Sequence, residues 1–167
     1  MPTGRLFTVG HGTRAANELV GVLHDAGVAR LVDVRRYPGS RRNPQFGRDA
    51  LAETLDAAGI AYDWQGETLG GRRSGRDGSR HRAWRNAAFR AALDALLASA
   101  AEKPTAAMCA ETLWWRCHRR LIADAATVRG FDVVHLGAGP PALHVLHPDA
   151  RLDLEGTLVY DGGRART

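Results

Sequence analysis

The sequence predicts an α/β domain, with a mainly parallel sheet of about five strands between two layers of helices. Apolar segments of strand length alternate with segments of helical periodicity, which is the pattern of parallel strands joined by crossover helices. The strand segments are apolar throughout, so we expect both faces of the sheet to be buried. The 167 residues are typical of a single domain, which we expect to span 1–167.

The first half of the chain predicts three strands and two helices. The segment RLFTVG at 5–10 is apolar and ends at a glycine, as a buried strand does. Apolar residues then recur at helical spacing, and Thr13 is expected to cap this helix. Two prolines and two glycines make 36–47 a loop. The predicted strands are 5–10, 29–35 and 60–64, and the predicted helices are 13–26 and 48–58.

The second half begins with the segment 65–82, which holds five glycines and five arginines. Such a composition predicts a long, mobile basic loop, and long loops in compact domains are usually functional or disordered. Helices are then predicted at 83–103 and 112–129, and strands at 104–109 and 131–136. Short extended pieces are expected in the tail at 142–148 and 157–163.

The positive charge of the chain is concentrated in two segments. The net charge is +5, and all but one of the 23 basic residues are arginine. Residues 34–48 carry five arginines and no acid, and residues 72–90 carry seven arginines and one aspartate. This distribution favours an anionic partner, such as a nucleotide or nucleic acid. The alternative is a solvated basic surface.

Polar residues follow three of the predicted strands. His11 comes after the first strand, Asp33 and Arg35 end the second, and Cys109 and Glu111 follow the fourth. Ligands of open α/β sheets bind outside the carboxyl ends of the strands. We therefore expect these residues to lie at one edge of the sheet and to form a site.

Anion binding is the chemistry that the sequence favours most, because guanidinium matches phosphate with a fixed fork. Several arginines follow the second strand, and two more follow a double glycine whose amides can approach an anion. The chain has neither of the familiar phosphate-binding motifs, G-x-x-x-x-G-K-[ST] and G-x-G-x-x-G. The predicted anion-binding residues are Arg35, Arg36, Arg41, Arg42, Arg72, Arg73 and Arg119.

His11, Glu111 and Cys109 are the candidate catalytic residues. Glu111 beside a histidine can act as a general base, or it can simply cap a helix or hold an arginine. Cys109 is predicted to approach a helix N-terminus, where a thiol pKa is lowered; the alternative is a buried cysteine. Glu111 and His118 would share a face of the predicted helix.

A metal site is not expected. Cys109, Cys117 and His118 are soft ligands, but C-x7-C-H is not a usual zinc spacing. Cys117 continues a row with Leu113 and Leu121, which predicts a small core residue. We assign a supporting role to Asp33, Cys117 and His118, and no cofactor.

The N-terminus has no signal pattern, and no apolar run is long enough to span a membrane. We therefore expect a cytoplasmic protein without a membrane partner. In that compartment Cys109 and Cys117 are expected to be reduced, with no disulfide between them.

Several segments carry a resemblance to a known family. TVGHG, LVDVRRYPGSRRNPQF, LGGRR, AWRNAAF and MCAETLWWRCHRRLIA together resemble the domain of unknown function 488 family, over residues 7 to about 147. The resemblance implies a compact α/β domain and supplies no established activity. The family usually has a serine after its Gly-His, where this chain has Gly12, so no hydroxyl at this position belongs to a site.

Two functional hypotheses follow. The first is an enzyme-like pocket for a phosphate-bearing ligand, such as a nucleotide or a nucleic-acid end, with His11 and Glu111 as the acid/base pair. The second is a non-catalytic nucleic-acid-binding module, in which segments 35–48 and 72–90 track a backbone and Tyr37, Phe46 or Trp84 stacks on a base. The oligomeric state is left open.

Overall fold

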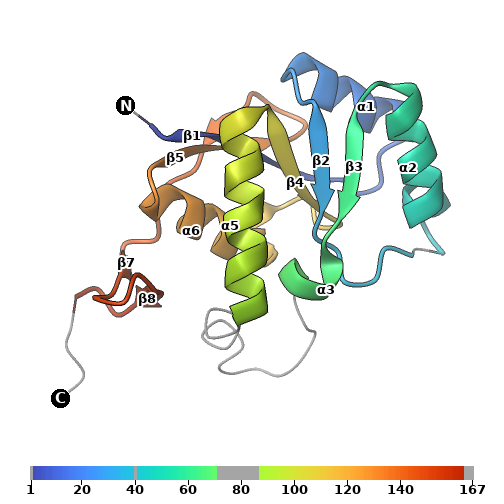
Figure 1. Cartoon of the computed structure of the whole chain (residues 1–167). Helices are drawn as coiled ribbons and strands as arrows, with labels where there is room; N and C mark the ends of the chain where they lie inside the picture. Colours follow the sequence, from blue (N-terminus) through green and yellow to red (C-terminus); the bar gives the residue numbers. More distant parts are fainter. Residues whose placement is uncertain (1, 40, 71–86, 164–167) are drawn as a thin grey trace.

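The computed structural model describes residues 2–39, 41–70 and 87–163. Within these residues the main sheet has six strands in the order β3-β2-β4-β1-β5-β6 (Figure 1). Strands β1 to β5 pair in parallel, and β6 runs antiparallel to β5. The strands are Gly4–Gly10 (β1), Arg30–Asp33 (β2), Ala61–Trp64 (β3), Thr105–Cys109 (β4), Phe131–Leu136 (β5) and Ala142–Leu143 (β6). The predicted fold class is confirmed, with a sixth, short strand in place of five.

Helices cover both faces of the sheet (Figure 1). Helices α1 and α2 contribute to one apolar core, and α5 and α6 contribute to the other. A two-stranded hairpin of β7 and β8 follows the sheet. The helices are Ala16–Asp25 (α1), Arg48–Ala57 (α2), Gly66–Leu69 (α3), Ala87–Glu102 (α5) and Arg119–Val128 (α6), and the hairpin strands are Ala150–Leu152 (β7) and Leu158–Tyr160 (β8).

Strand β1 shows why the strand sequences are apolar on both sides. Leu6 packs into the core under α5 and α6, whereas Phe7 and Val9 pack into the core under α1 and α2. All three side chains are buried. Burial of one such side chain contributes about 1.5–3 kcal/mol, so the sheet is stabilised from both faces.

The helix predicted at 112–129 is wrong at its start, because α6 begins only at Arg119. Leu113 and Cys117 have extended backbones on either side of a 3-10 turn. Trp114 in that turn stacks on His135 of β5 with ring centroids 4.3 Å apart. This tertiary contact overrides the helical periodicity. The predicted row of Leu113 and Cys117 with Leu121 therefore does not form, and Glu111 shares no helix face with His118.

The predicted helix cap at Thr13 is also wrong. Helix α1 begins at Ala16, and Ala15 is its N-cap. The Glu18 carboxylate accepts a hydrogen bond from the backbone N–H of Ala15 at 3.4 Å. The backbone N–H of the N-cap residue is thus bonded by the carboxylate of Glu18, inside the first turn, and the hydroxyl of Thr13 does not cap the helix.

The segment predicted as a long basic loop, 65–82, begins with the single turn of α3. Residues 71–86, which include Arg72, Arg73 and Trp84, lie outside the described residues. In the part of the chain that the structure describes, no helix is both long enough and apolar enough to cross a membrane.

Candidate functional site at the carboxyl edge of the sheet

Five of the predicted site residues lie at the edge formed by the carboxyl ends of β1, β2 and β4: His11, Asp33, Arg35, Cys109 and Glu111. The backbone N–H of His11 donates to the carbonyl of Cys109 at 3.0 Å. Gly10 is required here, because a Cβ at this position would lie 2.0 Å from the carbonyl oxygen of Glu111. The segments after β1 and β4 are therefore in direct contact, and the predicted convergence at one edge is confirmed.

The centre of this edge is a buried ion pair between Asp33 and Arg35. The guanidinium donates from Nε to Oδ1 at 2.9 Å and from Nη2 to Oδ2 at 2.7 Å, and the Arg35 backbone N–H also reaches Oδ1. Tyr62 donates its hydroxyl to Oδ2 at 2.6 Å. Burial and the hydrogen bond to Asp33 raise the pKa of Tyr62 well above its usual value, so this tyrosine stays a donor.

His11 completes this cluster, which we call the arginine network (His11, Asp33, Arg35 and Tyr62). Its Nδ1–H donates to the carbonyl of Gly12 at 2.7 Å, and its Nε2 accepts from Arg35 Nη1 at 3.3 Å. Burial lowers the pKa of His11, and the charge of Arg35 lowers it further. The imidazole is therefore neutral at pH 7, with its tautomer fixed by the two contacts.

The arginine loop, residues 36–45, leaves the sheet directly after this network and is anchored at both ends. At its start, Trp64 Nε1 donates to the carbonyl of Arg35 at 2.8 Å. At its end, Gln45 Nε2 donates to the carbonyl of Arg14 at 2.8 Å. The next residue, Phe46, is fully buried and stacks on His11 with ring centroids 4.4 Å apart. Phe46 therefore cannot stack on a base, and that part of the nucleic-acid hypothesis is wrong.

The arginine loop has two exposed arginines and one half-buried arginine. Arg41 and Arg42 are exposed, and Arg36 is half-buried with its guanidinium 5.9 Å from the centre of the Tyr37 ring. Among the described residues, none of these three arginines forms an ion pair. Arg35 is therefore buried in an ion pair, whereas Arg36, Arg41 and Arg42 lie on the loop without an ion pair to another described residue.

Glu111 lies at the same edge but does not contact the imidazole of His11. Its side chain is exposed, and its Oε1 accepts from the backbone N–H of Leu113 at 3.4 Å. The partners of His11 are Gly12 and Arg35 instead. The acid/base role of the pair stays a prediction, since a ligand would have to bridge the two side chains.

Arg119 is buried and hydrogen-bonds to the loop after β4. It is 1% exposed, and its Nη2 donates to the carbonyls of Glu111 and Thr112 at 2.8 and 3.2 Å. Its Nη1 donates to Thr8 Oγ1 at 3.3 Å. Arg119 therefore holds the loop after β4 against β1 through backbone carbonyls rather than through the Glu111 carboxylate.

The two cysteines and His118 form a separate cluster on the α6 side of the sheet. Both cysteines are free thiols; Cys109 is buried and Cys117 is half-buried. Cys117 Sγ lies 3.6 Å from His118 Nδ1 and accepts from the backbone N–H of Arg119 at 3.5 Å. The helix N-terminus that was predicted beside Cys109 thus lies beside Cys117. No group of three or more metal-ligating side chains is found among the described residues.

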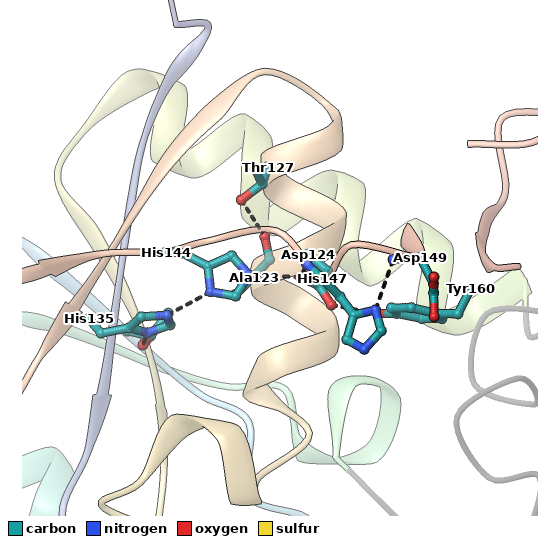
Figure 2. A network of polar contacts seen from close by, with 9 residues as sticks. Ala123, Asp124, Thr127, His135, His144, His147, Asp149 and Tyr160 are labelled. Atoms are coloured by element: carbon teal, nitrogen blue, oxygen red, sulfur yellow. Dashed lines mark hydrogen bonds and ion pairs between the residues drawn. The ribbon is translucent and has the colours of Figure 1, made fainter. Parts of the chain in front are cut away.

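A buried histidine chain on the α6 face was not predicted (Figure 2). Thr8 Oγ1 lies 2.6 Å from His135 Nδ1, and His135 Nε2 lies 2.9 Å from His144 Nδ1. His144 Nε2 lies 2.8 Å from Asp124 Oδ1, and Tyr160 donates its hydroxyl to Asp124 Oδ2 at 2.8 Å. The only signals in the sequence were polar residues inside apolar segments, in FDVVHL and LIADAAT.

The protons of the histidine chain can be assigned from its contacts. Burial lowers the pKa of His135 to about 3, and nearby His144 and Arg119 contribute, so this ring is neutral. Thr8 accepts from Arg119, which leaves its own O–H to donate to His135 Nδ1. The proton of His135 is then on Nε2 and donates to His144, whose own proton donates to the Asp124 carboxylate.

Comparison with known proteins identifies one family. The model of the domain of unknown function DUF488 matches residues 15–126. This range contains the Asp33–Arg35 pair and the arginine loop, and it ends before His135 and His144. Neither the curated proteins nor the solved structures give a match.

Proposed function

Because the chain belongs to the DUF488 family, whose description names no activity, we propose a function from the site itself: the protein binds a phosphate-bearing ligand at the carboxyl edge of its sheet. The arginine loop carries the proposal. It presents Arg36, Arg41 and Arg42 without an ion-pair partner among the described residues, in a segment that contains no acid. Cations held together in this way are stabilised when an anion binds between them.

The anchoring of the loop supports binding of a defined ligand. Its ends are fixed by hydrogen bonds from Trp64 and Gln45 and by the stacking of Phe46 on His11. Loop ordering is one of the costs of association, and a loop that is already held has less freedom to lose. The buried Asp33–Arg35 pair therefore serves as the base of the site, and Arg41 and Arg42 serve as its ligand contacts.

Tyr37 favours a nucleotide or a nucleic-acid end over free phosphate. Its ring is 79% exposed and lies beside the Arg36 guanidinium. An exposed aromatic ring next to unpaired arginines offers a stacking surface for a base and charge for its phosphate. In this arrangement Glu111 and His11 flank the ligand as the acid/base candidates.

The test is ligand binding at low salt, measured by thermal shift and calorimetry. The probes are inorganic phosphate, adenosine mono- and triphosphate, and a short single-stranded oligonucleotide with and without a 5′-phosphate. A nucleotide at one hundred times its Kd should stabilise the protein by about 2.7 kcal/mol. The effect should weaken with salt, because exposed charges are screened within about 10 Å at 0.1 M.

Two double variants make the test specific. Arg41→Ala with Arg42→Ala should remove most of the binding without changing the fold. Arg5→Ala with Arg30→Ala removes the same charge from the amino ends of β1 and β2 and should leave binding intact. Equal loss in both variants, or no stabilisation of the wild type by any probe, would refute the proposal.

The oligonucleotides separate the proposal from the alternative of a nucleic-acid-binding module. A site for a nucleotide or a strand end requires the 5′-phosphate. A module that tracks the backbone binds both oligonucleotides equally, with an affinity that falls steeply with salt.

A further inference from the structure

Cys117 occupies an unusual position for a core cysteine. It is the last extended residue before His118, the N-cap of α6. Its sulfur accepts a hydrogen bond from the backbone N–H of Arg119 at 3.5 Å and lies 3.6 Å from His118 Nδ1. Cys109, whose own thiol donates to the carbonyl of Glu111 at 3.4 Å, belongs to the apolar core against which Cys117 packs. One backbone donor and one imidazole nitrogen therefore contact the half-buried sulfur of Cys117.

The ring of His118 is held in the orientation that this contact needs. Its Nε2 donates to the carbonyl of Leu69, in α3, at 2.5 Å. The proton on Nε2 is thereby fixed, and Nδ1 faces Cys117. A neutral ring can accept the thiol proton at Nδ1, and the resulting imidazolium can donate back to the thiolate. This arrangement of thiol, imidazole and orienting group is that of an activated nucleophile.

We propose that Cys117 is a thiolate that reacts with small hydroperoxides and that Cys109 is the thiol that then forms a disulfide with it. Such a pair requires one thiol with a lowered pKa, which attacks, and one that keeps its proton, and the two cysteines differ in this way. The contact with Cys109 lowers the pKa of Cys117, and His118 lowers it further, against the effect of burial. Burial and the contact with Cys117 raise the pKa of Cys109. The hydrogen bonds have the same direction: the Cys109 thiol donates to the carbonyl of Glu111, whereas the Cys117 sulfur accepts from the backbone N–H of Arg119. The negative charge therefore belongs to Cys117 and the proton to Cys109.

The reaction takes two steps. In the first, the Cys117 thiolate attacks one peroxide oxygen, an S–O bond forms and the O–O bond breaks. The sulfur loses two electrons and becomes a sulfenic acid, which keeps the hydroxyl group of the peroxide. The other peroxide oxygen leaves and takes one proton, the proton that His118 accepted from the thiol, to give an alcohol or water. In the second, the sulfur of Cys109 attacks Cys117, an S–S bond forms, and the hydroxyl leaves with the Cys109 proton as water.

Burial defines the class of substrate. Cys117 is half-buried and Cys109 is 3% exposed, so a bulky disulfide has poor access to either sulfur. A hydroperoxide needs to bring only one small oxygen to Cys117. Cys109 belongs to the core against which Cys117 packs, and its burial protects it from the oxidant until the sulfenic acid forms.

The first experiment measures alkylation of the wild-type protein by iodoacetamide between pH 5 and pH 9, resolved by peptide mass spectrometry. Cys117 should reach half of its maximal rate below about pH 6, whereas an ordinary cysteine does so near pH 8.5. At pH 6 it should react at least roughly tenfold faster than Cys109. His118→Gln should move the Cys117 profile toward that of an ordinary thiol, and in guanidinium both cysteines should react alike.

The second experiment treats the folded protein with hydrogen peroxide. The wild type should lose two hydrogen atoms in intact mass and yield a Cys109–Cys117 disulfide peptide. Cys109→Ser should instead accumulate a sulfenic acid that dimedone traps at Cys117, and Cys117→Ser should give neither product. Alkylation of wild-type Cys117 with a midpoint near pH 8.5, or oxidation of Cys109 first, would overturn the proposal. Nucleotide binding does not enter either experiment, so the two proposals fail independently.

Discussion

The two buried polar networks of this protein use the same charges in different ways. In the arginine network, on the α1 and α2 side of the sheet, Arg35 and Asp33 touch at 2.7 Å. In the histidine chain, on the α6 side, the cation Arg119 and the anion Asp124 stand at opposite ends, with one hydroxyl and two imidazoles between them. One network is a contact ion pair, and the other joins a cation to an anion through a row of oriented hydrogen bonds.

Because of this difference, we expect the two networks to have different roles. The contact pair is compact, and the loop that follows it exposes Arg41 and Arg42, neither of which forms an ion pair with another described residue. The histidine chain ties together β1, α6, β5, the segment after β6 and β8, and Trp114 covers it by stacking on His135. The first network lies at the base of the proposed site, whereas the second holds the C-terminal segment on the sheet.

Among the variants that distinguish the two networks, Asp33→Asn is expected to lose the most unfolding free energy. This change leaves the buried guanidinium of Arg35 without its charge partner, which should cost about 3–5 kcal/mol of unfolding free energy. Urea denaturation at pH 7 measures the loss. Asp161→Asn is the control, because it breaks the solvent-accessible Arg151–Asp161 pair and should change stability little. Equal losses in the two variants would show that the Asp33–Arg35 pair does not depend on burial.

A smaller loss is expected for Asp124→Asn. The amide can still accept from His144, but its NH2 group would face the hydroxyl of Tyr160 in place of a carboxylate oxygen. Among the described residues Asp124 forms no ion pair with an arginine, so this change removes no partner from the buried guanidinium of Arg119, which contacts Thr8 and two backbone carbonyls. We therefore expect a loss of about 1.5–3 kcal/mol, the range for hydrogen bonds to a charged group. A loss larger than that of Asp33→Asn would contradict the picture of a neutral chain.

The sequence predicted the arginine network better than the histidine chain, and the reason is the spacing of their residues. Asp33 and Arg35 are neighbours at the end of one strand, so the edge rule for parallel sheets places them together. The histidine chain joins Thr8 to Tyr160 through contacts between elements that are remote in sequence. Strand and helix periodicity carries no information about which buried polar residues meet.

Local pattern also failed where a tertiary contact was stronger. The start of the helix predicted at 112–129 was wrong because Trp114 stacks on His135, and this moved the helix N-terminus from Cys109 to Cys117. The predicted roles of the two cysteines depended on that boundary. Phe46 was misread for a similar reason, since nothing in the sequence shows that its partner is His11.

Acid should weaken the protein through the histidine chain, starting below about pH 6.5. The pKa of His135 is about 3 in the folded protein and about 6.5 in the unfolded chain. Below pH 6.5 only the unfolded chain takes up this proton, so the unfolding free energy should fall by about 1.4 kcal/mol per pH unit, or about 2 kcal/mol at pH 5. The loss levels off below about pH 3, and the lowered pKa of His11 adds a loss of the same sign.

Urea denaturation at several pH values between 7 and 4 measures this slope. His135→Gln should reduce it by about one proton, because glutamine does not titrate. The imidazole of His135 should remain neutral at pH 5 in nuclear magnetic resonance spectra. An unchanged slope in His135→Gln would mean that His135 does not bind its proton differently in the two states.

The smallest losses of unfolding free energy are expected when either of two tyrosines, one in each network, is replaced. Tyr62 donates to Asp33 at 2.6 Å and Tyr160 donates to Asp124 at 2.8 Å. Phenylalanine at either position should therefore cost about 1–2 kcal/mol at pH 7. The two losses are similar in size, so the variants are distinguished by their pH dependence and by ligand binding.

For Tyr160→Phe the sign of the pH effect follows from Asp124. Burial raises the pKa of Asp124, but hydrogen bonds from His144 and Tyr160 lower it by more. The hydroxyl thus stabilises the charged carboxylate, and the loss in Tyr160→Phe should be complete above about pH 3.8. It should disappear as the pH falls through the lowered pKa of Asp124 and the carboxylate is protonated.

Tyr62→Phe should instead weaken nucleotide binding in calorimetry, because Tyr62 and Arg35 share Asp33 at the base of the arginine loop. If Tyr160→Phe weakened nucleotide binding as much, the two networks would act as one unit across the sheet, and the division between a site and a scaffold would be wrong.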